Sequence, residues 1–194
     1  MESGDVVVVK GKTVVPEEKK VYLAFNKPRG IVCTAEKREK NNVIDYLSYP
    51  VRIYPVGRLD KDSEGLLLMT NDGAIVNGIM RARNRHEKEY QVEVNKEITP
   101  EFLKKMASGV PILDTVTRPC RIRKTGERSF TIILTQGLNR QIRRMCEALG
   151  YRVTKLKRVR IMNVHLKDLK TGEYRPLTEK ELAELKKQIG EEKR

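Results

Sequence analysis

Histidine and cysteine are scarce in this chain of 194 residues, and their scarcity limits the chemistry open to it. The two histidines, His86 and His165, lie far apart in the sequence, so a zinc site is not expected. The three cysteines, Cys33, Cys120 and Cys146, are odd in number and form no CxxC pair, which favours a reducing compartment over a disulfide framework. Each cysteine is interpreted as a small core residue.

Long apolar segments are also lacking. No run approaches the ~20 residues that a membrane-spanning helix needs, so no membrane partner is expected. The first residues, MESGD, lack the basic and apolar regions of a secretory signal peptide. Together with the cysteine usage, this favours a cytoplasmic protein.

Basic residues are in excess, with 40 lysines and arginines against 26 acidic residues and a net charge of +14. Such an excess favours binding to a phosphate backbone. It is concentrated between Arg140 and Arg160, where eight residues are basic and only Glu147 is acidic. A basic surface that served solubility alone would be more evenly spread, so the expected partner is a nucleic acid.

Helix-like patterns are interspersed among many strand-like ones and predict an α+β fold with a mainly antiparallel sheet. Residues 1–20 are interpreted as an N-terminal hairpin, with its strands in Val6–Val15 and Gly11 near the turn. Residues 21–190 form the main domain and 191–194 a charged tail. Strands are expected at Val21–Phe25, Leu66–Met69, Tyr90–Val94, Arg118–Lys124, Ser129–Leu134 and Tyr151–Ile161, and helices at Val43–Leu47, Ala74–Arg83, Pro100–Ser108, Leu138–Leu149 and after Thr178.

The most informative segment is the GRLD turn at residues 57–60, which precedes the apolar strand expected at Leu66–Met69. It places the Asp60 carboxylate beside the Arg58 guanidinium at the rim of a buried sheet. A carboxylate near fixed positive charge stays ionised and is available as a nucleophile or base. With the basic charge of the chain, this suggests an enzyme that performs carboxylate chemistry on a nucleic acid.

Three other polar segments are expected to meet this turn in one cleft. They are a basic KPRG turn at 27–30, a KEY tripeptide at 88–90 that places a tyrosine at the start of a strand, and the arginine-rich helix start LNRQIRR at 138–144. Asp62 and Glu64 are interpreted as exposed turn residues.

The GRLD turn, the KEY tripeptide and the segment GLNRQIRRM resemble motifs of the RNA pseudouridine synthases, in the branch that modifies ribosomal RNA. The similarity runs from about Tyr22 to Leu182 and is greatest to the large-subunit enzymes, through PVGRLDKDSEGL, NDG, HEKEY, GVPIL, QGLNRQIRRMCE and RIMNV. It implies a pseudouridine synthase fold, with a central, mixed and mostly antiparallel sheet flanked by helices, and two subdomains with the active cleft between them. Members of this branch usually begin with a small helical RNA-binding module, and GDVVVVKGKTVV resembles only its last hairpin, so residues 1–20 are interpreted as a remnant of it.

The resemblance also implies roles for single residues. Asp60 matches the catalytic aspartate, which acts at the target uridine so that the uracil leaves the ribose and rejoins it through carbon 5, with no cofactor or metal. Arg143 matches the arginine that pairs with this aspartate and orients it. Tyr90 matches the aromatic residue that stacks on the flipped uracil, and Arg58 the arginine that helps to extrude the nucleotide.

Further residues are assigned by the same resemblance. Leu156 is expected to pack under the base, although a core position would explain it equally well, and Arg158 is expected to support the site. Lys27 and Arg29 are expected to hold phosphate or to support the active-site strand. The remaining residues assigned to RNA binding are Arg140, Arg144 and Lys155.

Ordinary structural explanations stand beside these roles. Arg143 would otherwise be a helix-surface arginine, Tyr90 a strand tyrosine with a buried ring, and Arg58 a phosphate-binding or turn-stabilising arginine. The expected function is isomerisation of a uridine to pseudouridine in ribosomal RNA, that of the large subunit (23S), by a monomeric enzyme. The alternative is a non-catalytic RNA-binding factor for ribosome assembly with the same fold, and the joint presence of Asp60, Tyr90 and Arg143 weighs against it. A nuclease has little support, because the sequence shows no metal-binding carboxylate cluster.

Overall fold

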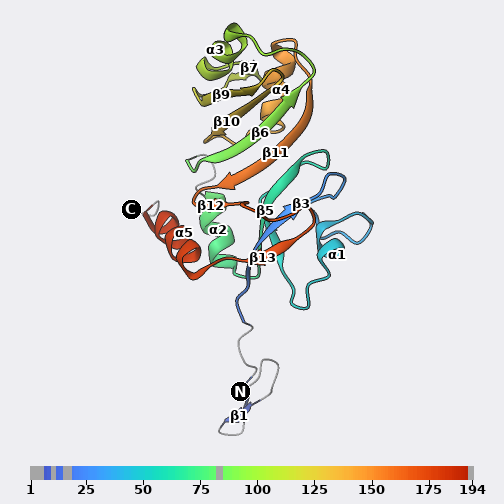
Figure 1. Ribbon diagram of the computed structural model, residues 1–194. Helices are drawn as coiled ribbons and strands as arrows, with labels where there is room; N and C mark the ends of the chain where they lie inside the picture. The colour runs from blue at the N-terminus through green and yellow to red at the C-terminus, as the bar shows by residue number, and fades with distance from the viewer. Residues whose placement is uncertain (1–6, 10–11, 15–18, 82–84, 192–194) are drawn as a thin grey trace.

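The computed structural model describes residues 7–9, 12–14, 19–81 and 85–191 (Figure 1). The strands are β1 (Val7–Val9), β2 (Lys12–Val14), β3 (Tyr22–Lys27), β4 (Tyr54–Val56), β5 (Glu64–Thr70), β6 (Lys88–Val94), β7 (Pro111–Ile112), β8 (Thr115–Val116), β9 (Arg121–Gly126), β10 (Ser129–Leu134), β11 (Val153–Ile161), β12 (Val164–His165) and β13 (Tyr174–Pro176). The helices are α1 (Val43–Leu47), α2 (Gly73–Arg81), α3 (Pro100–Ser108), α4 (Gln141–Ala148) and α5 (Glu179–Glu191).

One sheet runs through both halves of the molecule (Figure 1). Its strands lie in the order β13-β3-β5-β11-β6-β10-β9, with β4 paired to β5 and β12 paired to β11. The pairing of β5 with β11 is parallel, and the other pairs in the described sheet are antiparallel. This is the mixed and mostly antiparallel α+β sheet that the sequence predicts.

The first lobe is built around the antiparallel pair β3 and β5. Strand β5 is continuously apolar because both of its faces are covered. Leu66 and Leu68 pack in the cluster that includes α2 and α5, whereas Leu67 and Met69 pack with Phe25 in the cluster that includes α1. In Figure 1, α2 and α5 accordingly lie on one side of these strands and α1 on the other.

The second lobe is a sheet of β11, β6, β10 and β9 with α3 and α4 on one face. Val92 of β6 and Ile132 of β10 point into its core, where they meet Phe102 of α3 and Met145 of α4. The alternate residues of β6, such as Gln91, are exposed on the other face. The alternation of buried and exposed residues along β6 therefore reflects a sheet with one face covered by helices and one face open to solvent.

Helix starts follow the expected capping chemistry. Thr99 caps α3 by accepting a hydrogen bond from the Phe102 amide at 3.1 Å. Thr178 and Glu181 form a reciprocal capping box at α5, in which each side chain accepts from the other's amide, at 3.1 and 2.9 Å. These side chains satisfy amides that the helix itself leaves unpaired.

The two lobes meet where β5 pairs with β11. Arg158 lies opposite Gly65 in this pairing. Gly65 has a φ of +110°, and a Cβ placed there would lie 2.2 Å from the Arg158 carbonyl oxygen. The two backbones can come this close only because residue 65 has no side chain.

Several expected boundaries differ from the observed ones. Strands β1 and β2 do pair as a hairpin, with Val7 opposite Val14, but the turn expected near Gly11 lies outside the described residues, as do residues 192–194 of the expected tail. The described part of α2 ends at Arg81, and α4 begins at Gln141 rather than Leu138. The two- and three-residue strands β4, β7, β8, β12 and β13 were not predicted, because such short segments carry no readable alternation. Among the described residues, no helix has the length and apolar character needed to cross a membrane.

Candidate active site

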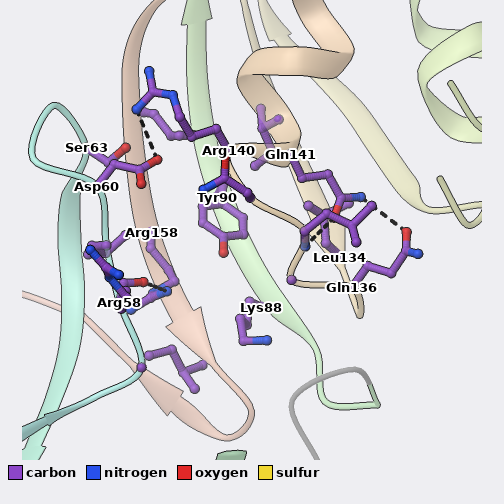
Figure 2. A pocket seen from close by; sticks show the side chains of 18 of the residues that line it. Arg58, Asp60, Ser63, Lys88, Tyr90, Leu134, Gln136, Arg140, Gln141 and Arg158 are labelled. Carbon is purple, nitrogen blue, oxygen red and sulfur yellow. Dashed lines mark hydrogen bonds and ion pairs between the residues drawn. The ribbon is translucent and has the colours of Figure 1, made fainter. Parts of the chain in front are cut away.

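A cavity of about 430 Å³ lies between the two lobes (Figure 2). Figure 2 shows Arg58 and Asp60 on one side, Gln136 and Gln141 on the other, and Tyr90 on the strand between them. The volume falls within the range typical of small-molecule sites. The GRLD turn, the KEY strand and the start of α4 thus meet in one cleft, as the sequence predicts, whereas the fourth segment, KPRG, supports the turn from behind.

Asp60 is presented at the edge of the first lobe by a turn with a buried anchor. Leu59 is only 7% exposed, and its amide donates to Cys33 Sγ at 3.4 Å. The Asp60 carbonyl accepts from the Ser63 amide at 3.0 Å, which closes the next turn. These contacts fix the backbone on both sides of the carboxylate, whose side chain remains 35% exposed.

The Asp60 carboxylate has one ion pair within the described part of the chain. Its Oδ2 lies 3.4 Å from Nη1 of Arg140. The sequence predicted a different pairing, with Arg143, and this contact is not the one found. Arg140 is the last residue before α4 and faces the turn, whereas Arg143 is one helical turn further on, with a side chain only 9% exposed. Arg58 is exposed at the cavity and makes no ion pair with Asp60 among these residues.

Asp62 is the centre of the contacts between the lobes. Arg140 donates to both of its carboxylate oxygens, each at 3.1 Å. Arg143 Nη2 donates to the Asp62 carbonyl at 3.0 Å and to Ser63 Oγ at 3.1 Å. The hydrogen bond from Arg140 is the main reason that the pKa of Asp62 lies below its usual value. Asp62 does lie in a turn, with its side chain 39% exposed, but the carboxylate is paired with Arg140. Glu64, which was also expected in an exposed turn, is instead the first residue of β5 and its side chain is only 19% exposed, so that interpretation is wrong.

Lys27 is buried, so it presents no surface to a phosphate, which was one of its two predicted roles. The residue is 0% exposed, and its ammonium donates to the carbonyls of Pro28 at 3.0 Å and Ile31 at 2.7 Å. Burial lowers the pKa of this amine. The segment that it holds is tied to the turn that carries Asp60, because the Gly30 amide donates to the Lys61 carbonyl at 2.7 Å. The alternative role, support of the active-site strand, fits this geometry, and Arg29 remains exposed beside it.

Arg158 also supports the turn from within. It is 5% exposed, and its guanidinium donates to the carbonyls of Leu66 at 2.8 Å and Arg58 at 3.4 Å. These bonds agree with the predicted support of the site and leave little of the group for a phosphate. Leu156, on the same face of β11, packs in the second lobe's core, which confirms the core interpretation, and it also lines the cavity, where packing under a base stays a prediction.

Two other predicted RNA contacts lie outside the cavity lining. Arg144 donates to the backbone carbonyl and the side-chain oxygen of Asn139, both at 2.9 Å, and so stabilises the segment before α4. Lys155 is exposed and lies 3.9 Å from Glu64.

The sequence did not single out the two glutamines of the cavity wall. Gln141 is 5% exposed; its side-chain oxygen accepts from the Leu138 amide at 3.2 Å, and its amide group donates to Gln136 at 3.4 Å. The sequence did contain a signal for Gln141, because this residue is a polar side chain that faces the core at the start of an arginine-rich helix. In the part of the chain that the structure describes, no three His, Cys, Asp or Glu side chains come together to hold a metal ion.

The two-lobed sheet holds an aspartate, a tyrosine and arginines around one cleft, which is the arrangement that the resemblance to the pseudouridine synthases predicts. The chain matches the RNA pseudouridylate synthase family over residues 21–148 and belongs to it. This confirms the family that the motifs indicated. A solved structure described as a pseudouridylate synthase has the same fold, with a TM-score of 0.79 and 29% identity over 95% of this chain and 82% of that one.

Three individual proteins with pseudouridine synthase names are similar to the chain. The chain is 54% identical over 189 residues to the dual-specificity RNA pseudouridine synthase RluF of Salmonella typhi, and 53% identical over 191 residues to the protein of that name in Escherichia coli (strain K12). These alignments cover 96% and 97% of the chain but 65% and 66% of the relatives, so the chain spans about two thirds of their length. It is also 36% identical over 190 residues to ribosomal large subunit pseudouridine synthase B of Bacillus subtilis, covering 94% of this chain and 78% of that protein.

Proposed function

We propose that the chain isomerises a uridine to pseudouridine in RNA, and that its substrate is the ribosomal RNA of the large subunit. The observation that carries the proposal is the position of Asp60 and Tyr90 on one cavity between the lobes, with Arg58 exposed at its edge. The net charge of +14 supports a polyanionic substrate. The names of the similar proteins from Salmonella typhi and Bacillus subtilis support the reaction and the ribosomal substrate respectively.

The reaction exchanges one ribose bond for another. The bond between ribose C1′ and uracil N1 breaks, the uracil turns, and a bond forms between C1′ and C5. The proton leaves C5, and N1 ends with a proton, so no cofactor is needed to balance the atoms. The Asp60 carboxylate, which accepts no side-chain hydrogen bond among the described residues, suits both a covalent path, in which it attacks C1′, and a glycal path, in which it removes a ribose proton.

The uridine reaches Asp60 only if it leaves its helix. Unstacking a nucleotide costs a few kcal/mol, which contacts with the enzyme must offset. Tyr90 lines the cavity and stacks on the flipped uracil, a contact worth ~1–3 kcal/mol. Arg58 lies exposed beside the cavity, where its planar cation can replace the base in the vacated stack.

The test is tritium release from RNA that carries uridine labelled at carbon 5. The wild-type chain should release tritium from large-subunit ribosomal RNA, and Asp60→Asn should release none while it binds the RNA within about threefold of wild type. Asp168→Asn is the matched control, because Asp168 is an exposed aspartate outside the cavity lining. Undiminished release from Asp60→Asn would disprove the assignment of the carboxylate.

The same assay separates the alternative functions. A non-catalytic ribosome-assembly factor would bind RNA and release no tritium from any substrate, even as wild type. The description of two similar proteins as dual-specificity supports a second RNA substrate, so transfer RNA should be assayed beside ribosomal RNA.

A further inference from the structure

The sheet of the second lobe has an open face that the active site does not use. Helices α3 and α4 pack against the face that carries Val92 and Ile132, whereas Gln91 is exposed on the opposite face. A hollow of about 370 Å³ lies on that opposite face, lined by residues of β6, β10 and β11. Tyr90, the residue before Gln91 in β6, lines the active-site cavity (Figure 2). Because successive residues of a strand point to opposite faces, the hollow lies behind the strand that carries Tyr90.

A row of four side chains crosses this open face. Lys157 of β11 lies opposite Gln91 of β6, and Gln91 lies opposite Thr131 of β10. Arg123 of β9 lies opposite Thr131 and completes the row. Residues paired in this way project to the same face, so the four side chains form one strip, called the open-face strip below. It has a cation at each end and two neutral polar groups between them, and its ends are about 14 Å apart because neighbouring strands are separated by about 4.8 Å.

The two cations of the open-face strip have no acidic partner, unlike the cations of the adjacent row. In that row, Arg160 and Arg121 both pair with Glu87, at 3.1 and 2.6 Å. Within the described part of the chain, neither Arg123 nor Lys157 forms an ion pair or a side-chain hydrogen bond. Their positive charges are therefore available to an anion from outside the protein.

The acidic side chain nearest to the strip on the other side is balanced by a lysine. Glu93 of β6 lies opposite Lys155 of β11 in the next row of the sheet. Gln91 and Thr131, in the middle of the strip, are uncharged and carry both hydrogen-bond donors and acceptors. The open-face strip thus keeps two positive charges on a flat, polar surface.

This chemistry fits the backbone of double-stranded RNA. The end cations attract phosphates, and the amide of Gln91 and the hydroxyl of Thr131 match 2′-hydroxyl groups, which both donate and accept hydrogen bonds. Unpaired bases would instead need aromatic rings to stack on. The one aromatic residue that lines the hollow, Phe130, is only 1% exposed and packs in the core on the far side of the sheet.

We propose that the open-face strip binds an RNA duplex that lies outside the target loop. The proposal rests on the RNA substrate proposed above and adds a second contact with it. One substrate molecule is then held on both faces of β6, with the flipped uridine beside Tyr90 and a duplex from another part of the folded RNA along Gln91. The second contact raises the affinity for large, folded RNA without touching the reacting atoms.

The first test measures binding of an RNA duplex without unpaired uridines, by fluorescence anisotropy over a range of salt concentrations. The double variant Arg123→Gln/Lys157→Gln removes both end charges and keeps the surface polar. Its Kd for the duplex should rise roughly tenfold or more at about 0.15 M salt, and the slope of log affinity against log salt should fall by about 2. Its Kd for an RNA single strand of the same length should change less than about threefold.

The matched control removes two positive charges from other surfaces. Lys104 of α3 and Lys187 of α5 are exposed and lie outside the open face. Lys104→Gln/Lys187→Gln should bind the duplex within about threefold of wild type, because the proposed contact is local. Unchanged duplex binding in the strip variant would overturn the proposal, as would an equal loss in the control or an equal loss for the single strand.

Tritium release connects the strip to the substrate. On an isolated stem-loop with a uridine that wild type modifies, the strip variant should keep kcat and KM within about threefold, because the strip and the cavity lie on opposite faces of β6. On whole large-subunit ribosomal RNA, KM should rise about tenfold while kcat stays the same. An unchanged KM on the whole RNA, or an equal rise on the stem-loop, would overturn the proposal.

The failure of the strip and the failure of the proposed function give different results. A wild-type chain that releases no tritium would reject the function, and the binding of the duplex would still decide the role of the strip. Circular dichroism melts identify a variant that unfolds at the assay temperature. If the double variant does so, the single variants decide, because Arg123→Gln and Lys157→Gln should each lower the salt slope by about 1, and an unchanged slope in both would overturn the proposal.

Discussion

Replacing Gly65 by alanine should strongly destabilise the protein, because the two lobes touch at this residue without room for a side chain. A Cβ at residue 65 would lie 2.2 Å from the Arg158 carbonyl oxygen and 2.6 Å from its nitrogen. The first distance is more than 1 Å short of the 3.4 Å at which ordinary contact begins. Both neighbours are backbone atoms, so neither can move aside by changing a rotamer.

The expected cost has two parts. Overpacking of this kind costs about 1–3 kcal/mol, and the φ of +110° adds about 1–2 kcal/mol for a residue with a side chain. To relieve the contact, β5 would have to separate from β11 at its two paired positions, Glu64 with Lys157 and Gly65 with Arg158. A loss of about 3 kcal/mol, or roughly 10 °C in Tm for a chain of this size, is therefore expected.

Urea denaturation and thermal melts of Gly65→Ala measure this loss. The matched control is Gly73→Ala at the first residue of α2, where an added Cβ meets nothing within 4 Å. That variant should stay within about 0.5 kcal/mol of wild type, because surface substitutions without special contacts usually do. A Gly65→Ala protein as stable as the Gly73→Ala control would refute the argument that the lobes are in backbone contact here.

Three further predictions concern stability and RNA binding. The hydrogen bond from Arg175 lowers the pKa of Glu181 to about 2, so the contribution of Glu181 to the free energy of unfolding is present above pH ~4.5 and is lost as the pH falls toward 2. Urea titrations at pH 7 should show Glu181→Gln less stable than wild type by up to about 3 kcal/mol. A stability difference that did not shrink by pH 2.5 would contradict this. Thr99→Ala should cost about 1 kcal/mol by removing the cap of α3, and an unchanged urea midpoint would count against the cap. Arg29→Ala should reduce the slope of log affinity for RNA against log salt by about 1, whereas an identical slope would show that this exposed arginine neutralises no phosphate.

The parts of the fold that the sequence predicted are those with strong local signals. The continuous apolar run of β5, the alternation of β6 and the capping residues of α3 and α5 each depend only on residues that lie close together in the sequence. The mostly antiparallel character of the sheet was also predicted, whereas no order of strands was. The short strands escaped prediction because they exist only through their pairing with distant partners, as β13 does with β3.

The errors at the site have a common physical origin. Lysine is rarely buried, and nothing near Lys27 in the sequence indicates that its ammonium finds two carbonyl acceptors within its own turn. The choice between Arg140 and Arg143 depended on the residue at which α4 begins and on a left-handed backbone at Arg140. Both are set by contacts with the other lobe, about 80 residues away in the sequence, so a local pattern could not reveal them.

The geometry of Asp60 depends on two separate connections between the lobes. On one side of the turn that carries Asp60, Arg158 of β11 donates to the Arg58 carbonyl, next to the close backbone approach at Gly65. On the other side, Arg140 and Arg143 hold Asp62 and Ser63. Because the turn from residue 58 to 63 is held at both ends by the second lobe, a shift of one lobe against the other displaces the carboxylate relative to Tyr90. The inter-lobe contacts should therefore affect catalysis as well as stability, and a variant such as Gly65→Ala should lose kcat even at temperatures where it remains folded.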